Sequence, residues 1–244
     1  MFQPPFSTLE NVVADIRDHG YALLAPTDVE RMTGFARREL DALLPAWNEL
    51  PADEHLRDGG RYRYRRHASY RVEAGVLEDV PHRAHWQSLD YNALHGGMLR
   101  WFAPIGDDTR QQPAWRRILT SLGNICDQVR GPDRWSVEAH QFRIDTGEGI
   151  GRPTPEGAHR DGVDFVAVFL LARHQIKGGE TRVFEADGPT GLRFTLEDPW
   201  SLMLMDDPRV IHESTPIQPL QEGVAGHRDT LVITYRAGGF QDEV

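Results

Sequence analysis

The sequence contains a single cysteine, Cys126, and a single lysine, Lys177, among its 244 residues. A lone cysteine excludes an internal disulfide and any zinc site built from several thiolates. Cys126 also falls within an apolar helical pattern, which favours a small buried side chain over a nucleophile. All other basic residues are arginines, which indicates a general compositional bias, so the abundance of arginine carries no functional meaning by itself.

Long apolar runs and an excess of positive charge are also absent. No run approaches the roughly 18 apolar residues that cross a bilayer, and residues 1–5 lack the basic and apolar regions of a signal peptide. We therefore expect a cytoplasmic location and no membrane partner. The net charge of −10 has the wrong sign for binding a phosphate backbone, which argues against nucleic acid. The expected partner is a small-molecule substrate, and the sequence leaves the oligomeric state open.

The first half of the chain is predicted to be mainly helical. A Ser-Thr-Leu-Glu capping box at 7–10 predicts a helix that ends near Gly20, followed by a short strand at 21–25. A second helix, capped by Thr27 or Asp28, should run until Pro45, and a third should begin near Pro113. Each helix is apolar on one side only, so these helices need another layer to pack on.

Beyond residue 135 the pattern changes to short β-rich runs separated by Gly, Pro and Asp turns. The predicted strands are 136–144, 163–171, 180–185, 191–196, 201–205, 210–216 and 230–236. Short strands at this spacing, without intervening helices, are typical of an antiparallel jelly roll. No linker or composition shift divides the chain. We therefore predict a mainly β single domain over 1–244, with residues 1–134 packing on a core at 135–238.

One His-x-Asp triplet is followed, in a later strand, by a further histidine. His159 and Asp161 form the triplet and His212 follows, whereas about one such triplet is expected by chance and the chain contains two. The second, at 227–229, has no histidine after it. Residues i and i+2 of an extended segment share a face, so His159 and Asp161 can reach one ion while His212 approaches from a facing strand. Two imidazoles and one carboxylate are ligands for Fe(II) with open positions.

The order His-x-Asp, about fifty residues, His, then a strand that opens with Arg resembles the Fe(II)/2-oxoglutarate-dependent dioxygenases. The Gly-Gly-Glu-Thr turn at 178–181 and the segment 212–217 resemble their motifs, and the likeness covers about 135–238. More narrowly, the helical first half resembles the bacterial branch that includes L-isoleucine hydroxylases. The resemblance implies a double-stranded β-helix and an enzyme that uses Fe(II), 2-oxoglutarate and O2. It further implies that a small molecule, such as a free L-amino acid, is hydroxylated, with release of succinate and CO2.

The same resemblance assigns residues to the cosubstrate. His159, Asp161 and His212 would be catalytic through the bound iron. Arg228, at the start of the last strand, suits the far carboxylate of 2-oxoglutarate because a guanidinium pairs with a carboxylate through two parallel hydrogen bonds. Thr230 shares its strand face, and Arg236 is a rival on that face. Gln141 is a further candidate for this pocket.

Substrate contacts are expected from the basic segment at 61–67. Strand alternation puts Arg63 and Arg65 on one face, with Tyr64 and Arg66 on the other, so the segment can clamp an anion beside aromatic walls. A solvated edge strand is the competing interpretation. Arg143, which precedes the triplet, is a further substrate candidate, and the glycine-rich loop at 145–157 is a candidate lid.

Two other functions are compatible with the same residues. One is a metal- or 2-oxoglutarate-binding sensor or interaction protein that keeps the site without turnover. The other is a cupin-like enzyme with another divalent metal, since two histidines and a carboxylate also suit Mn or Zn. The position of Arg228 argues against the cupin-like enzyme, because that chemistry needs no diacid cosubstrate.

Overall fold

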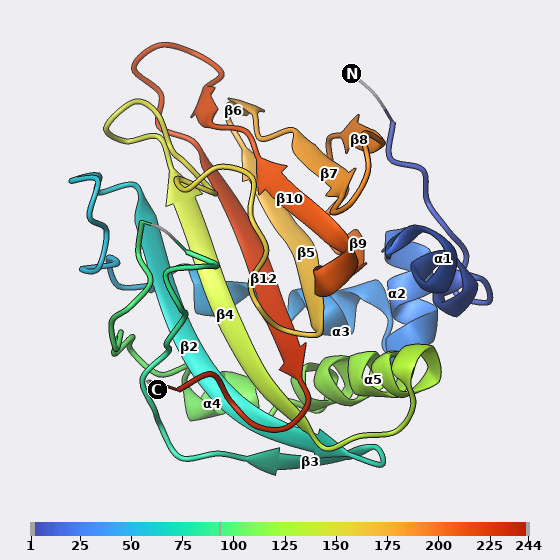
Figure 1. The fold of residues 1–244 in the computed structure, drawn as a ribbon. Helices are drawn as coiled ribbons and strands as arrows, with labels where there is room; N and C mark the ends of the chain where they lie inside the picture. Colours follow the sequence, from blue (N-terminus) through green and yellow to red (C-terminus); the bar gives the residue numbers. More distant parts are fainter. Residues whose placement is uncertain (1–2, 93, 243–244) are drawn as a thin grey trace.

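A computed structural model describes residues 3–92 and 94–242, in which helices pack against antiparallel strands (Figure 1). The helices are α1 (Val12–His19), α2 (Pro26–Thr33), α3 (Arg37–Asp41), α4 (Asp107–Arg110) and α5 (Pro113–Arg130), with 3-10 turns η1 (Leu44–Trp47) and η2 (Asp207–Arg209). The strands are β1 (Tyr21–Leu24), β2 (Arg63–Glu73), β3 (Val76–Asp79), β4 (Trp135–Asp145), β5 (Phe165–His174), β6 (Ile176–Gly178), β7 (Thr181–Glu185), β8 (Gly191–Phe194), β9 (Leu202–Asp206), β10 (Val210–Ser214), β11 (Ile217–Pro219) and β12 (His227–Arg236). None of the helices in these ranges combines the length and apolarity needed to cross a membrane.

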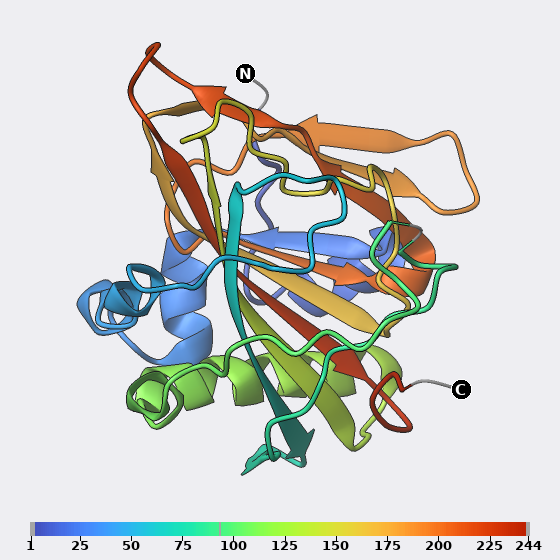
Figure 2. The same ribbon diagram turned by 90° about the vertical axis from the view of Figure 1, so that its left-hand side faces the viewer.

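Seven strands form the main sheet, in the order β1-β9-β5-β12-β4-β2-β3, and two smaller sheets are formed by β10-β7-β8 and β11-β6. Strand β12 lies in the middle of the main sheet and pairs antiparallel with both β4 and β5. Figure 2 shows the helices on one side of the main sheet and the smaller sheets on the other. The prediction of a mainly β, double-stranded β-helix core with packed helices is therefore confirmed.

Strand alternation sends neighbouring residues of β12 to opposite layers. Leu231, Ile233 and Tyr235 belong to the apolar core shared with the helices, and the Tyr235 hydroxyl donates to the Leu119 carbonyl of α5. The residues between them face the smaller sheets and line a pocket. Burial of apolar side chains on one face thus orients the polar residues of the other face into the pocket.

Two helix predictions need correction. The helix expected from the capping box begins only at Val12, because the backbone N–H of Ser7 donates to the Leu23 carbonyl at 2.7 Å. The helix expected to run to Pro45 is broken after Thr33, where Gly34 takes a left-handed conformation with φ +72° and ends α2. The helix α5 begins at Pro113 as predicted.

Candidate active site

His159, Asp161 and His212 lie together in one pocket between the sheets. Their ligand atoms all lie within 4.8 Å of one another. A short antiparallel bridge holds the two histidines, since each backbone N–H donates to the other's carbonyl at 3.0 Å. The carboxylate of Asp161 lies near both rings, with Oδ1 3.9 Å from Nε2 of His159 and Oδ2 3.7 Å from Nε2 of His212. The predicted ligand set is therefore brought together from two separate segments.

Both imidazoles can offer a lone pair. Nδ1 of His159 lies 2.9 Å from the Gly157 carbonyl, so this nitrogen carries the proton and Nε2 is free. Burial, and then the neighbouring His159, lowers the pKa of His212 to about 4, so His212 is neutral at pH 7. The ring nitrogens of His159 and His212 and a carboxylate oxygen of Asp161 are the donor set that suits an Fe(II) ion with positions open for other ligands.

A buried carboxylate that the sequence did not identify holds the turn carrying Asp161. Asp207, in η2, accepts hydrogen bonds from the backbone N–H groups of Asp161, Gly162 and Val163 at 3.0, 2.8 and 3.2 Å. Burial, together with the charge of Asp161, raises the pKa of Asp207 to about 7. Asp207 thereby fixes the backbone from which the candidate metal ligand projects.

The second triplet, at 227–229, does not form a metal site. Asp229 is occupied by Arg143, whose Nε and Nη2 donate to its two oxygens at 2.8 and 2.7 Å. Nε2 of His227 lies 3.6 Å from Asp229, and these two residues belong to none of the metal-like clusters found among the described residues. The expectation that only the first triplet supplies ligands agrees with this geometry.

Arg228 lies in the same pocket as the triad, and no ion pair to it is found among the described residues. Its side chain is 4% exposed, and its Nε has no hydrogen-bond partner among the described residues. Burial, and then the charge of Arg173, lowers its pKa to about 10, so it remains a cation. Thr230 lines the pocket beside it, whereas the rival Arg236 donates to the carbonyls of Gly239 and Phe240. A buried guanidinium without a counter-ion fits a carboxylate of a bound ligand.

Two predictions made on β4 are wrong, because the register turns these side chains to the helical side of the main sheet. Gln141 is fully buried and lines a different pocket, beside η1 and α4. Arg143 pairs with Asp229 on the same side. The pocket with the triad instead receives the alternate residues Glu138, His140 and Phe142.

Most of the basic segment forms the start of β2, which pairs with β4 on one side and is bridged by Ala52 and Pro104 on the other, so it is not a solvated edge. Arg63 and Arg65 are 6% and 4% exposed and line the pocket, and Arg63 donates to Asp53 at 2.7 Å. Tyr64 and Arg66, also predicted as substrate contacts, point to the opposite face. Tyr64 packs on the helical core, and Arg66 donates to the carbonyls of Pro104 and Glu49. The prediction of Tyr64 and Arg66 as substrate contacts is therefore wrong. Strand alternation puts them on the face opposite Arg63 and Arg65, which line the pocket.

A third buried arginine, Arg100, joins these two in the pocket and was not identified from the sequence. It is 2% exposed, and no ion pair to it is found among the described residues. Burial, and then repulsion by Arg63, lowers its pKa to about 10. These three guanidinium groups lie on or beside β2 and define the arginine-lined end of the pocket.

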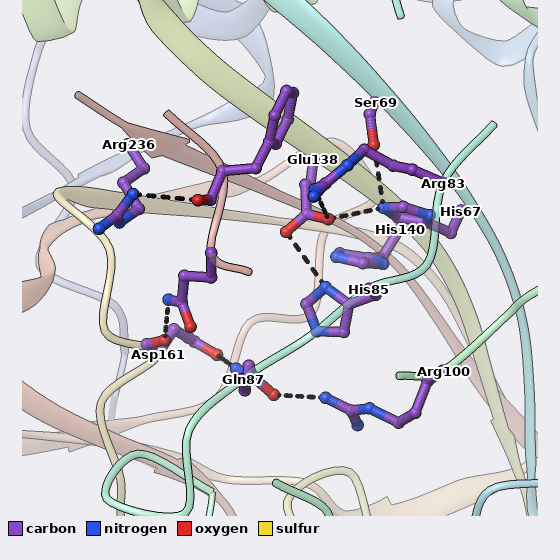
Figure 3. Close-up of polar contacts among 12 residues, drawn as sticks. His67, Ser69, Arg83, His85, Gln87, Arg100, Glu138, His140, Asp161 and Arg236 are labelled. Atoms are coloured by element: carbon purple, nitrogen blue, oxygen red, sulfur yellow. Dashed lines mark hydrogen bonds and ion pairs between the residues drawn. The ribbon is translucent and has the colours of Figure 1, made fainter. Parts of the chain in front are cut away.

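Two carboxylates also line this pocket, and the sequence identified neither. Glu138 accepts from His67 at 3.0 Å and from His85 at 3.1 Å, with Arg83 3.7 Å away (Figure 3). Glu156, from the loop at 145–157, lies 3.5 Å from Nε2 of His159, and its other oxygen has no partner among the described residues. The pocket therefore presents negative groups as well as positive ones.

The histidines around Glu138 form a second cluster with metal-like spacing. His67, His85, Glu138 and His140 have ligand atoms within 4.8 Å of one another. However, Nη2 of Arg65 lies 2.8 Å from Nδ1 of His140, and a guanidinium at that distance opposes a second cation. We interpret the cluster as a hydrogen-bonded support for Glu138.

Acid should destabilise the fold partly through His85. Burial lowers its pKa from 6.5 to about 4 against the opposing charge of Glu138. Because the pKa of His85 is lower in the folded state, its contribution to the free energy of unfolding is complete above pH 6.5 and is lost as the pH falls through 4. The loss is at most about 3 kcal/mol. Urea unfolding between pH 6.5 and 4 should show a smaller loss in His85→Gln, whose amide can still donate to Glu138. Equal losses in the two proteins would contradict this assignment.

Comparison with known proteins places the whole arrangement in context. The profile of a family described as 2OG-Fe dioxygenase matches residues 44–234. The crystal structure of a bsmA homolog from Methylobium petroleophilum PM1 is 51% identical and has a TM-score of 0.94, with 99% of this chain and 98% of that chain covered. No curated protein sequence matches the chain.

More distant solved structures share the fold. IDO from Bacillus thuringiensis is 17% identical with a TM-score of 0.76, over 98% of this chain and 99% of that chain. The Fe(II)/(alpha)ketoglutarate-dependent dioxygenase TqaL is 18% identical with a TM-score of 0.71, over 94% of this chain and 87% of that chain.

Proposed function

The chain belongs to the 2OG-Fe dioxygenase family, and from that premise we propose that it hydroxylates a free L-amino acid. The enzyme is an Fe(II)/2-oxoglutarate-dependent dioxygenase whose cofactors are iron(II), 2-oxoglutarate and O2. The family leaves the substrate open, so the substrate has to be inferred from the charges in the pocket.

We assign the iron and the cosubstrate to two groups of residues that line the same pocket. His159, Asp161 and His212 would hold the iron, and Arg228 with Thr230 would hold the far carboxylate of 2-oxoglutarate. When bound, iron and 2-oxoglutarate supply the oxidative decarboxylation to succinate and CO2 that drives hydroxylation. The low exposure of Arg228 strengthens its attraction to a carboxylate, because little water screens the pair.

The observation that carries the amino-acid proposal is the pairing of buried cations and anions in the rest of the pocket. Arg63, Arg65 and Arg100 offer donors for an α-carboxylate, while Glu138 and Glu156 offer acceptors for an α-ammonium group. A zwitterion satisfies both kinds of group, whereas a purely anionic molecule leaves the unpartnered oxygen of Glu156 without a cation and an uncharged one also leaves Arg100 without an anion.

The pocket also has room for an apolar side chain beside the metal ligands. Phe142, Val168, Val232 and Met203 line it, all from strands of the main sheet. An aliphatic substrate side chain would bury its surface against these groups, at about 25 cal/mol per Å². Its C–H bonds would then lie on the side of the pocket that carries the triad.

A screen of the twenty amino acids should find at least one that stimulates succinate formation about tenfold over the rate without substrate. The N-acetyl derivative and the methyl ester of that amino acid should both lose the stimulation, because each removes one charge that the pocket pairs. Succinate and the hydroxylated product are measured together by mass spectrometry. No stimulation by any amino acid, or equal stimulation by the blocked derivatives, would overturn the proposal.

A further inference from the structure

The buried carboxamide of Gln87 connects Asp161 to the arginine-lined end of the pocket (Figure 3). Nε2 of Gln87 donates to Oδ1 of Asp161 at 3.1 Å. Oε1 of Gln87 accepts from Nη2 of Arg100 at 2.8 Å and from Nδ2 of Asn92 at 3.2 Å. Gln87, Asn92 and Arg100 are all less than one-tenth exposed. A continuous set of hydrogen bonds therefore runs from a guanidinium to a candidate iron ligand.

The orientation of this carboxamide is fixed by its partners. The carbonyl of Gln87 has to face Arg100, because a guanidinium only donates hydrogen bonds. Asn92 is itself oriented, since its Oδ1 accepts from the backbone N–H of His95 at 2.7 Å and leaves its Nδ2 as the donor. A flipped Gln87 would direct its NH2 group at two donors and its oxygen at the carboxylate of Asp161. Arg100 and Asn92 thus keep the N–H of Gln87 on Asp161.

Arg100 is the arginine of the pocket best placed to sense a ligand. Arg63 pairs with Asp53, and Arg65 bonds to His140, but the acceptor found for Arg100 among the described side chains is the neutral amide of Gln87. Its Nε has no partner in the same set of residues. An anion in the pocket would therefore pair with Arg100 and compete with the amide oxygen for its N–H groups.

We propose that Gln87 is a positioning residue that couples occupancy of the arginine-lined end of the pocket to the orientation of Asp161. This rests on the proposed function, because it takes Asp161 as a metal ligand and Arg100 as a contact of the substrate carboxylate. Among the described residues, Gln87 is the side chain that donates a hydrogen bond to the Asp161 carboxylate. A change at Arg100 therefore reaches the metal ligand through one amide.

The affinity of the full-length protein for Mn²⁺, measured by calorimetry, tests the contact with Asp161 directly. Gln87→Leu should weaken Mn²⁺ binding by roughly 10- to 100-fold, the range seen when a partner of a metal ligand is removed. Gln241→Leu is the matched control, because Gln241 donates to the backbone carbonyls of Asp161 and Gly162 and not to the carboxylate. The control should bind Mn²⁺ much more tightly than Gln87→Leu, and equal losses would overturn the proposal.

A double-mutant cycle tests the connection to Arg100. Arg100→Met, which touches no candidate ligand, should weaken Mn²⁺ binding several-fold in the unchanged protein and have no further effect in Gln87→Leu. Arg100→Lys, which keeps the charge but loses the planar fork, should give a smaller loss of the same kind and serves if the methionine variant does not fold. The same fold-loss in both backgrounds would overturn the coupling.

Turnover supplies the third readout and separates this proposal from the amino-acid function. The ratio of hydroxylated product to succinate should be lower in Gln87→Leu than in Gln241→Leu. A loosely held Asp161 would uncouple decarboxylation of 2-oxoglutarate from hydroxylation of the substrate. If no amino acid stimulates any protein, the amino-acid function fails and the Mn²⁺ cycle still decides the role of Gln87. If Mn²⁺ binding and product yield are unchanged in Gln87→Leu, the positioning role fails and amino-acid hydroxylation stands.

Discussion

His212→Ala should abolish iron-dependent formation of succinate from 2-oxoglutarate. His212 supplies one of the three ligand atoms that lie within 4.8 Å of one another, and it is the ligand contributed by the sheet β10-β7-β8. Its loss leaves two ligands on a single short turn. If loss of iron removes about 4 kcal/mol of transition-state stabilisation, the rate falls roughly 1000-fold. Succinate release, measured with added Fe(II) and a stimulating amino acid, gives this factor.

The second triplet provides a control within the same chain. His227 is also a histidine two residues before an aspartate, but Arg143 occupies that aspartate and the pair lies outside the cluster. His227→Ala should therefore retain succinate formation close to that of the unchanged protein. Substantial iron-dependent turnover in His212→Ala, or equal losses in the two variants, would contradict the assignment of the ligands.

Arg228→Met should raise KM for 2-oxoglutarate by about 100-fold, which corresponds to roughly 2.7 kcal/mol. The buried guanidinium has no counter-ion among the described residues, so the far carboxylate of 2-oxoglutarate would be the anion that it pairs with. Methionine keeps most of the side-chain volume and removes the charge. KM is obtained from succinate formation over a range of 2-oxoglutarate concentrations at saturating substrate.

Arg236→Met is the matched control. Arg236 lies on the same face of β12 as Arg228 but already donates to two backbone carbonyls. Its KM for 2-oxoglutarate should stay near that of the unchanged protein. A large rise in KM in Arg236→Met with little change in Arg228→Met would reverse the assignment, in favour of the rival named from the sequence.

The sequence alone predicted those parts of the site that depend on a local pattern of residues. The order of His159, Asp161, His212 and Arg228 along the chain, together with the family resemblance, predicted residues that the fold does bring into one pocket. The Gly-Gly turn shows a similar local requirement, because Gly178 has φ +80° and a Cβ there would lie 2.3 Å from the Pro216 carbonyl oxygen. Such requirements act over a few residues and can be identified without the fold.

Residues whose role depends on register or on distant segments could not be predicted. Gln141 and Arg143 share one face of β4, as predicted. Whether that face points into the pocket depends on which face the helices cover. Gln87 and Arg100 lie in segments outside the named helices and strands and reach the site only because the chain folds back over the main sheet. The single-domain organisation of residues 1–244 remains a prediction.

Mass spectrometry of a reaction under ¹⁸O2 tests the central claim most directly. The protein is supplied with Fe(II), 2-oxoglutarate and a mixture of the twenty free amino acids, with His212→Ala run in parallel. A dioxygenase that hydroxylates a free amino acid places one labelled oxygen atom in succinate and the other in the hydroxylated amino acid. We predict both labels in the unchanged protein and neither in His212→Ala. Labelled succinate without any labelled amino acid would contradict the amino-acid substrate, and the absence of both labels would contradict the account as a whole.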